Sequence, residues 1–350
     1  MIGCVYLTAG CEINVSGNST TAGQLPRNFG VLSLSSPDPN IKRPYNLAYN
    51  VGLQHELLPG VSVSAEWFHD DFKNLMVRNN VARTADSYTL ANVVSPLDGS
   101  VIAAYNVKSG FVQSVQNVDS TDSNLTQSYN AVEFAINARL PRGARLFGGS
   151  STDRTISNSC DAAVTNPNFL LYCDQSRSGI PWRSQFKLVG TYPLPWGVQL
   201  SGSFQALPGY LLGTQALSGG FQISNAGLNL PNGAGTVWQI TPATRYAANC
   251  AGPCTPGALV IPGLTTATLN VPLIAPGTEQ TPRITQLDVA VGKWITRGGL
   301  RVQPKLEVFN ALNSADFFTV RTQVFGGSTY MQPGSVLQGR ILRVAAEMKW

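Results

Sequence analysis

The sequence predicts an all-β chain built from long antiparallel strands, and three observations support this fold class. Apolar and polar residues alternate over runs of about ten residues, which is the period of strands with two different faces. Many of the 34 Gly and 22 Pro residues separate these runs, as turn residues do. The connections alternate regularly between very short turns and long polar segments. A single large sheet of consecutive hairpins would produce this pattern.

Nine runs carry the alternation. In the first, Tyr45, Leu47 and Tyr49 share one side of the strand, and the residues between them are polar or small. The expected strands are 45–57, 61–68, 128–140, 144–155, 186–194, 198–206, 286–295, 300–308 and 342–350. Short turns are expected at 59–60, 141–143, 195–197 and 296–299. The long connections are expected at about 79–125, 156–181, 208–283 and 314–339.

Composition excludes two classes of protein. Charged residues make up 12% of the chain and hydrophobic residues 43%, with a mean hydropathy of +0.01. No stretch approaches the ~20 consecutive apolar residues that a membrane-spanning helix needs, so a helical membrane protein is excluded. The net charge is +5, but Lys and Arg are scattered singly, and nucleic acid is therefore not expected as a partner.

The six cysteines form three close pairs within turn-rich segments. The pairs are Cys4 with Cys11, Cys160 with Cys173 and Cys250 with Cys254. This spacing favours disulfides that close loops in an oxidising compartment. Zinc is the competing interpretation, but the two histidines, His55 and His69, are distant in sequence from every pair. We expect no metal site and no cofactor.

The alternation of short turns with long loops is typical of an outer-membrane β-barrel. Charged residues recur on the polar side of the runs, where a water-filled lumen tolerates them and a solid core does not. They include Glu56, Glu66, Glu133, Arg139, Lys187, Asp288, Arg301, Lys305, Glu307, Arg343, Glu347 and Lys349. Trp196, Trp294 and Trp350 are expected at one membrane edge, as an aromatic girdle. The expected location is the outer membrane of a Gram-negative bacterium.

Several segments resemble a known family. The final strand, with Leu342, Val344, Ala346, Met348 and Trp350 on one side, looks like the C-terminal strand that the barrel-assembly machinery recognises. The segment 306–313, LEVFNALN, resembles the penultimate-strand signature of TonB-dependent receptors. Segments 41–47 and 186–202 look like those of acidobacterial receptors that carry an N-terminal carboxypeptidase-regulatory-like domain. The resemblance covers roughly 39–350.

This resemblance implies a barrel of about 22 strands with a plug inside it. The chain would then supply about nine C-terminal strands over 44–350, preceded by an external loop segment over 1–43. The implied function is TonB-dependent uptake of a scarce solute, such as a small molecule or saccharide. The implied partners are outer-membrane lipid, the barrel-assembly machinery and, through an N-terminal part missing here, the TonB complex.

Other functions remain open. A surface-binding or structural barrel protein without transport would use the same strands, and a soluble secreted adhesin is a third possibility. Catalysis is not expected, because Asp70 and Asp71 are neighbours on a strand and point to opposite faces. His69 is expected to be a polar residue at a strand boundary. A ligand platform in the longest loop is possible from Tyr210, Phe221, Trp238 and Tyr246, but packing of that loop on itself is equally consistent.

Overall fold

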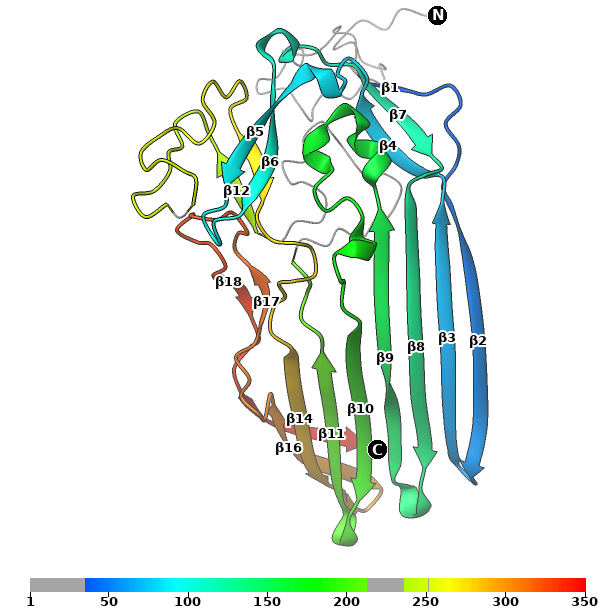
Figure 1. Ribbon diagram of the computed structural model, residues 1–350. Coiled ribbons are helices and arrows are strands. Elements are labelled where there is room, and N and C mark those ends of the chain that lie inside the picture. Colours follow the sequence, from blue (N-terminus) through cyan, green and yellow to red (C-terminus); the bar gives the residue numbers. More distant parts are fainter. Residues whose placement is uncertain (1–34, 213–235, 251) are drawn as a thin grey trace, which may run out of the picture.

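The protein consists of one long antiparallel sheet with a layer of shorter strands at one end (Figure 1). The computed structural model describes residues 35–212, 236–250 and 252–350. We call the long sheet the main sheet. Its strands are β2 (Tyr45–Leu58), β3 (Val61–Lys73), β8 (Thr126–Arg139), β9 (Arg145–Asn158), β10 (Arg183–Pro193), β11 (Val198–Leu207), β14 (Ile284–Lys293), β15 (Ile295–Arg297), β16 (Leu300–Phe309) and β19 (Ile341–Lys349).

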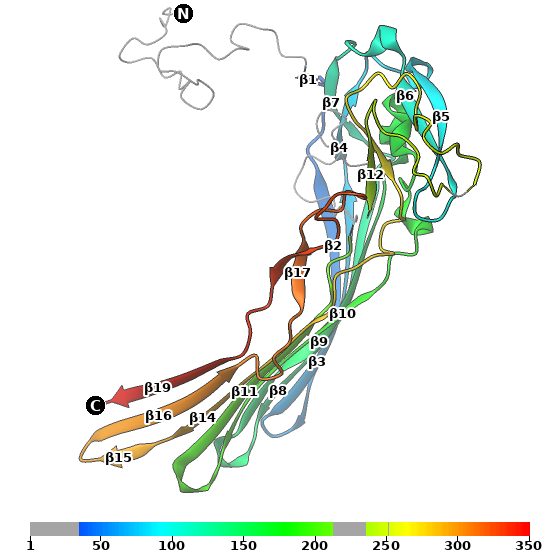
Figure 2. The ribbon, with the colours of Figure 1, turned by 90° about the vertical axis from the view of Figure 1, so that its left-hand side faces the viewer.

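Each strand from β2 to β14 pairs with the next in this series, and β14 and β15 both pair with β16, so the sheet is a continuous antiparallel meander. The order runs from β2 through β14 and β15 to β16, and β19 pairs with β16. The sheet is twisted and curved, and β2 and β19 form its two edges among the described strands (Figure 2). The all-β antiparallel fold expected from the sequence is confirmed, and the described strands form an open sheet that does not close into a barrel.

One expected strand is divided. Residues 286–295 were expected to form a single strand, but β14 ends at Lys293 and β15 begins at Ile295. Both pieces pair with β16, which makes the sheet ten-stranded where the alternation predicted nine runs. The break falls at Trp294 and interrupts the pairing with β16, whereas on the other side the Trp294 backbone N–H donates to the Gly197 carbonyl at 2.9 Å, in register with the β11–β14 ladder.

The two faces of the main sheet differ as the alternation predicts. Register aligns Leu53, Ala65 and Phe134 across three strands on the apolar face. The residues adjacent to these in sequence point to the other side of the sheet, where Gly52, Glu66 and Glu133 are aligned in the same way. We call these two sides the apolar face and the polar face. Apolar side chains are openly exposed, with Leu53 at 73%, so this face needs an apolar environment outside the chain.

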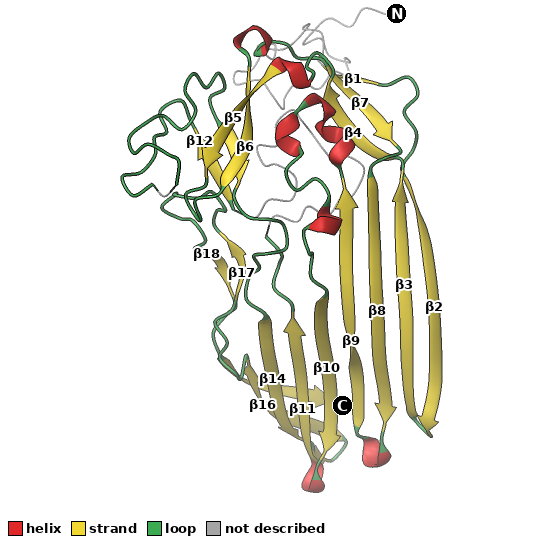
Figure 3. Cartoon of the chain, in the orientation of Figure 1, coloured by secondary structure: helices red, strands yellow, loops and turns green. Residues whose placement is uncertain are grey.

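Short turns join the strands at one end of the sheet, the turn end. Pro59–Gly60 links β2 to β3, and the 3-10 turns η3 (Pro141–Gly143) and η7 (Pro195–Gly197) link the next two hairpins (Figure 3). Arg142 and Trp196 have φ values of 63° and 61°. Each is followed by a glycine with positive φ, so these tight reversals depend on left-handed backbone positions.

The long connections fold into an ordered structure at the opposite end, which we call the loop layer (74–125, 159–182, 236–283 and 310–340). Its strands are β4 (Leu75–Asn80), β5 (Tyr88–Val94), β6 (Val101–Val107), β7 (Asn117–Asp122), β12 (Val237–Ile240), β13 (Leu269–Pro272), β17 (Phe317–Val320) and β18 (Pro333–Val336), and β1 (Ser35–Pro37) pairs with β7. Its 3-10 turns are η1 (Ala85–Ser87), η2 (Ser109–Phe111), η4 (Cys160–Thr165), η5 (Pro167–Phe169) and η6 (Gln175–Arg177). Within the described ranges, no helix is long and apolar enough to cross a membrane.

The principal hydrophobic core lies in the loop layer and not in the main sheet. Val93 and Ile102, from the β5–β6 hairpin, pack with Ile240 and Val271, from the β12–β13 hairpin. Val93 and Ile240 are completely buried. The sequence predicted these segments only as polar loops. Their strands have only four to seven residues and mix apolar, small and polar side chains, so the long alternation that marks the main sheet is absent.

Two disulfides lie in the loop layer. Cys160 is bonded to Cys173, with 4.8 Å between their Cα atoms, and Cys250 is bonded to Cys254, with 6.1 Å. The pair Cys4 and Cys11 lies outside the described residues. The first disulfide closes the loop that contains η4 and η5, and the second closes a short turn of the longest connection.

The LEVFNALN segment contains a buried polar junction at Asn310, which is 2% exposed and has a φ of 47°. Its backbone N–H donates to Asp288 Oδ1 at 2.8 Å. Its side-chain amide donates to the carbonyls of Ser314 and Gln338, both at 2.9 Å, and its Oδ1 accepts from the Ser314 N–H at 3.0 Å. Asn310 therefore ties β14, the end of β16 and the segment before β19 together.

Candidate functional site

A pocket of about 390 Å³ lies in the loop layer between three connections. One wall is the turn between β5 and β6, the second is the segment 244–250, and Phe325 closes the third side. Backbone hydrogen bonds fix Phe325 beside β12, because the Phe325 N–H donates to the Val237 carbonyl at 2.8 Å and the Val237 N–H donates to the Gln323 carbonyl at 2.9 Å. The volume lies within the range of about 300–1,000 Å³ that is common for small-molecule sites.

Three aromatic side chains line the pocket: Trp238, Tyr246 and Phe325. The rings of Trp238 and Tyr246 are 6.5 Å apart and inclined at 51°. All three pack with one side against the hydrophobic core of the loop layer and are only partly buried. The Tyr246 hydroxyl accepts a hydrogen bond from the Val94 N–H at 3.3 Å. The core therefore fixes the positions of rings that also border open space.

Polar groups surround the aromatic surface, among them Asp98, Arg245 and Asn249. The Ser100 hydroxyl and N–H donate to Asp98 Oδ1 at 2.8 and 3.1 Å. These hydrogen bonds, the hydroxyl first, lower the pKa of the exposed Asp98 carboxyl below its ordinary value. Arg245 is exposed and donates through Nη1 to the Gly257 carbonyl at 3.0 Å. The pocket thus carries an anionic and a cationic group beside an aromatic surface.

The aromatic residues considered from sequence do not all meet here. Trp238 and Tyr246 share the pocket, Tyr210 lies outside it at 58% exposure, and Phe221 is outside the described residues. Asp98 and Phe325 also line the pocket and were not predicted from the sequence. They are far from Trp238 along the chain, and only the pairing of distant loops brings them together, so no local pattern marks them.

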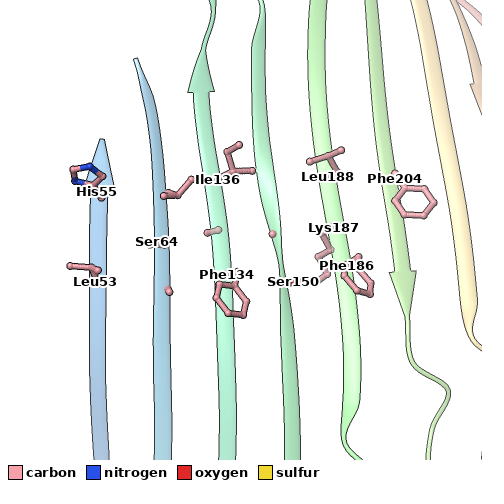
Figure 4. A pocket seen from close by; sticks show the side chains of 14 residues that line it. Leu53, His55, Ser64, Phe134, Ile136, Ser150, Phe186, Lys187, Leu188 and Phe204 are labelled. Carbon is pink, nitrogen blue, oxygen red and sulfur yellow. The ribbon is translucent and has the colours of Figure 1, made fainter. Parts of the chain in front are cut away.

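A second cavity, of about 580 Å³, is an open groove on the apolar face of the main sheet (Figure 4). Leu53, Phe134 and Phe186 project along it, and small residues such as Ala65 and Ser150 form its floor. Its lining is almost entirely apolar. It continues the surface that needs an apolar environment, so we assign it to contact with the surrounding membrane and not to a polar solute.

The polar face carries charges of both signs. Lys305 Nζ is 2.6 Å from Glu347 Oε2, Lys349 Nζ is 3.1 Å from Glu347 Oε1, and Arg343 pairs with Glu307. Toward the β2 edge of the same face, Glu66 lies directly opposite Glu133. A Cβ at Gly52 would lie 2.8 Å from Glu66 Cγ, so this glycine leaves space for the carboxylate side chain. Such a face suits contact with water.

The residues around Asp70 behave as strand neighbours. Asp70 pairs with Tyr129 on the polar face, and Asp71 pairs with Ser128 on the apolar face. His69 stacks against Trp67 with ring centroids 5.8 Å apart, and its Nδ1 lies 2.8 Å from Asn130 Oδ1. In the part of the chain that the structure describes, no three His, Cys, Asp or Glu side chains are grouped as a metal site would require.

The expected tryptophan girdle holds only in part. Trp196 and Trp350 are 86% and 98% exposed at the turn end. Trp294 also lies at that end, but its ring contacts cations of the polar face, with Arg301 at 4.9 Å and Lys349 at 5.1 Å from the centroid. Trp294 therefore lies at the expected end of the sheet, but its ring is on the polar face. Cation–π contacts hold its ring at the point where β14 gives way to β15.

The final strand presents an apolar edge. Leu342, Val344, Ala346 and Met348 alternate along β19, and all four are exposed. They pair through the backbone with residues of β16, and Trp350 follows the strand. The structure thus places the five residues of the expected assembly signal on one exposed side of the sheet. Their recognition by assembly machinery stays a prediction.

Comparison with solved structures finds distant likeness to outer-membrane proteins. The chain is similar to the outer membrane transporter YddB from Escherichia coli, with a TM-score of 0.38, 8% identity and 88% of this chain covered. It is similar to the ferric-catecholate import receptor Fiu from E. coli K12 (0.41, 11%, 87%) and to FpvAI in a complex with pyocin S2 (0.40, 9%, 87%). The chain spans 33%, 28% and 28% of those chains. No curated protein matches the sequence.

A protein-family model described as an outer membrane beta barrel domain matches residues 7–343, nearly the whole chain. The match agrees with the meander of long strands, the exposed apolar face and the charged polar face. The chain therefore belongs to the outer membrane beta barrel domain family and is a protein of the Gram-negative outer membrane.

Proposed function

We propose that the chain is the C-terminal barrel part of a TonB-dependent receptor that takes up a scarce solute. The observation that carries this proposal is the contrast between the two ends of the main sheet. The turn end has only tight reversals, whereas the opposite end supports a packed loop layer with a pocket. Short turns face the periplasm and long loops face outward in outer-membrane barrels, so the pocket would meet external solutes first.

The polar face supports a route for the solute below the pocket. Its carboxylates, amines and guanidinium groups would line a wet lumen once further strands complete the barrel. The exposed edges β2 and β19 are where such strands would pair, because an unpaired strand edge cannot remain in a lipid environment. Outer-membrane lipid would cover the apolar face, and the barrel-assembly machinery would insert the strands.

TonB dependence rests on the LEVFNALN resemblance, to which the structure adds the junction at Asn310. The TonB complex would act on an N-terminal plug outside this sequence. We propose a non-catalytic role for the whole protein. The alternative is a surface-binding or structural barrel that uses the same loop layer without transport.

The test is uptake of labelled solutes by whole cells of the source bacterium, with the gene intact or deleted. The panel contains neutral saccharides, ferric catecholates and cobalamin, each measured with and without a protonophore. An active receptor gives uptake that the deletion abolishes and the protonophore also abolishes. Binding that the deletion removes, with no energy-dependent uptake in intact cells, would favour the non-transporting alternative.

A further inference from the structure

The pocket in the loop layer has features that restrict the chemistry of its ligand. Trp238, Tyr246 and Phe325 present ring surface to a space that is also bordered by exposed polar side chains. The lining is mixed, whereas the groove on the apolar face is almost entirely apolar. A purely hydrophobic ligand would strip water from the charged groups of the pocket and offer no hydrogen bonds in its place.

The charges argue against a strongly ionic ligand. Asp98 is held as a carboxylate by hydrogen bonds from Ser100, so it repels anions. Arg245, on the opposite wall, repels cations. A ligand with a net positive or negative charge is therefore attracted by one of the two groups and repelled by the other. A neutral ligand is repelled by neither.

The same polar groups match hydroxyls. A hydroxyl donates one hydrogen bond and accepts others, so it can donate to the Asp98 carboxylate and accept from Arg245 or from the side-chain amide of Asn249. Aromatic rings complement a flat ligand that has an apolar face, and rings packed on a core need little reorganisation on binding.

We propose that this pocket binds a neutral polyhydroxylated ring, that is, a saccharide unit. The sugar stacks its C–H face on Trp238 and Tyr246, and its hydroxyls bond to Asp98, Arg245 and Asn249. The proposal rests on the proposed function, because it names the class of solute that the external pocket would meet. It concerns binding at this pocket, which can be measured without transport.

The experiment uses the intact polypeptide that contains this chain, in detergent. Saturation-transfer NMR from the protein is recorded with cellobiose, maltose and raffinose as neutral probes, choline as a cationic probe and 2,3-dihydroxybenzoate as an anionic probe. At least one saccharide is expected to receive saturation, strongest on the ring protons that lie against the aromatic surface. Dissociation constants follow from titration.

Variants test the assignment of residues. Trp238→Ala and Asp98→Asn are each expected to weaken saccharide binding about tenfold, through the loss of ring contact or of a charge-assisted hydrogen bond. Trp238 also packs on the core, so Asn249→Ala, at an exposed position, serves as a second variant that leaves the fold intact. The matched control is Trp182→Ala, which removes a half-exposed tryptophan that lies outside the pocket against Arg154.

The outcomes separate the two proposals. Saccharide binding that the pocket variants weaken, together with no energy-dependent uptake, supports the pocket and overturns the transport function. Energy-dependent uptake of a solute that does not bind here overturns the pocket assignment alone. Stronger binding of choline or dihydroxybenzoate than of every saccharide, or an equal effect of the Trp182 control, also overturns it.

Discussion

The main sheet and the loop layer are stabilised by opposite arrangements of apolar residues. In the main sheet Val51, Leu53 and Val344 are 69%, 73% and 79% exposed, and the polar side chains lie on the opposite face. In the loop layer Val93 and Ile240 are fully buried, as in a water-soluble domain. The same residue types therefore serve lipid contact in one region and core packing in the other.

The largest expected effect is the loss of packing in the loop layer. Ile240→Ala is expected to lower the unfolding free energy of this layer by about 2–5 kcal/mol, since it leaves a cavity among buried residues. Limited proteolysis would show cleavage within 236–283 while the main sheet stays resistant. Leu53→Ala, on the apolar face, is the matched control. If both variants were equally sensitive to protease, the loop layer would not differ from the main sheet in how its apolar residues contribute to stability.

A charged substitution tests the assignment of the apolar face to lipid contact. Leu53→Arg is expected to destabilise the membrane-inserted intact protein by about 2–4 kcal/mol, because the guanidinium would face hydrocarbon near mid-membrane. Gln54→Arg, one residue away on the polar face, is expected to cost much less. Urea unfolding in lipid vesicles measures both variants. If the two substitutions are equally harmful, the assignment of the faces fails.

The buried junction gives a smaller effect at the boundary between the two regions. Asn310→Ala is expected to cost about 1–3 kcal/mol, because the carbonyls of Ser314 and Gln338 lose their donor. Its positive φ adds some strain for alanine. Hydrogen exchange should increase at 338–341 and at the start of β19. Gln332→Ala, which removes an exposed side-chain bond to Ser328, should leave this exchange unchanged.

The smallest effect concerns pH in the loop layer. Burial raises the pKa of Tyr88, whose hydroxyl donates to the Thr165 carbonyl at 3.0 Å. The unfolded side chain ionises near pH 10 and the folded one only above that, so its contribution to stability is constant below about pH 10 and falls as the pH rises further. Denaturation of the loop layer between neutral pH and pH 11 should show this loss, and Tyr88→Phe should reduce it.

The long strands could be predicted because their alternation repeats over many residues. Between Tyr45 and Leu57 the alternation assigns side chains to one face of the strand or the other. A register error of one residue would move every side chain to the wrong face. The strand Val101–Val107 has no such signal, because it is short and its surroundings bury both apolar and small residues. Its assignment depends on a hairpin that only the folded loop layer provides.

Contacts between distant segments also determine where individual side chains lie. Trp294 was expected in an aromatic girdle from its place beside a turn, but contacts with Arg301 and Lys349 hold its ring on the polar face. The pocket could be anticipated only through Trp238 and Tyr246, which are close in sequence. Asp98 and Phe325 reach it through contacts between distant loops, and a linear pattern contains no information on those distances.

The junction at Asn310 anchors one end of the final strand. Its hydrogen bonds join β14, the end of β16 and Gln338 at one point. The start of β19 is therefore held twice, by its backbone pairing with β16 and by this junction at the border of the loop layer. Local opening of β19 from its first residue has to break both sets of bonds, so this edge strand is expected to fray from Trp350.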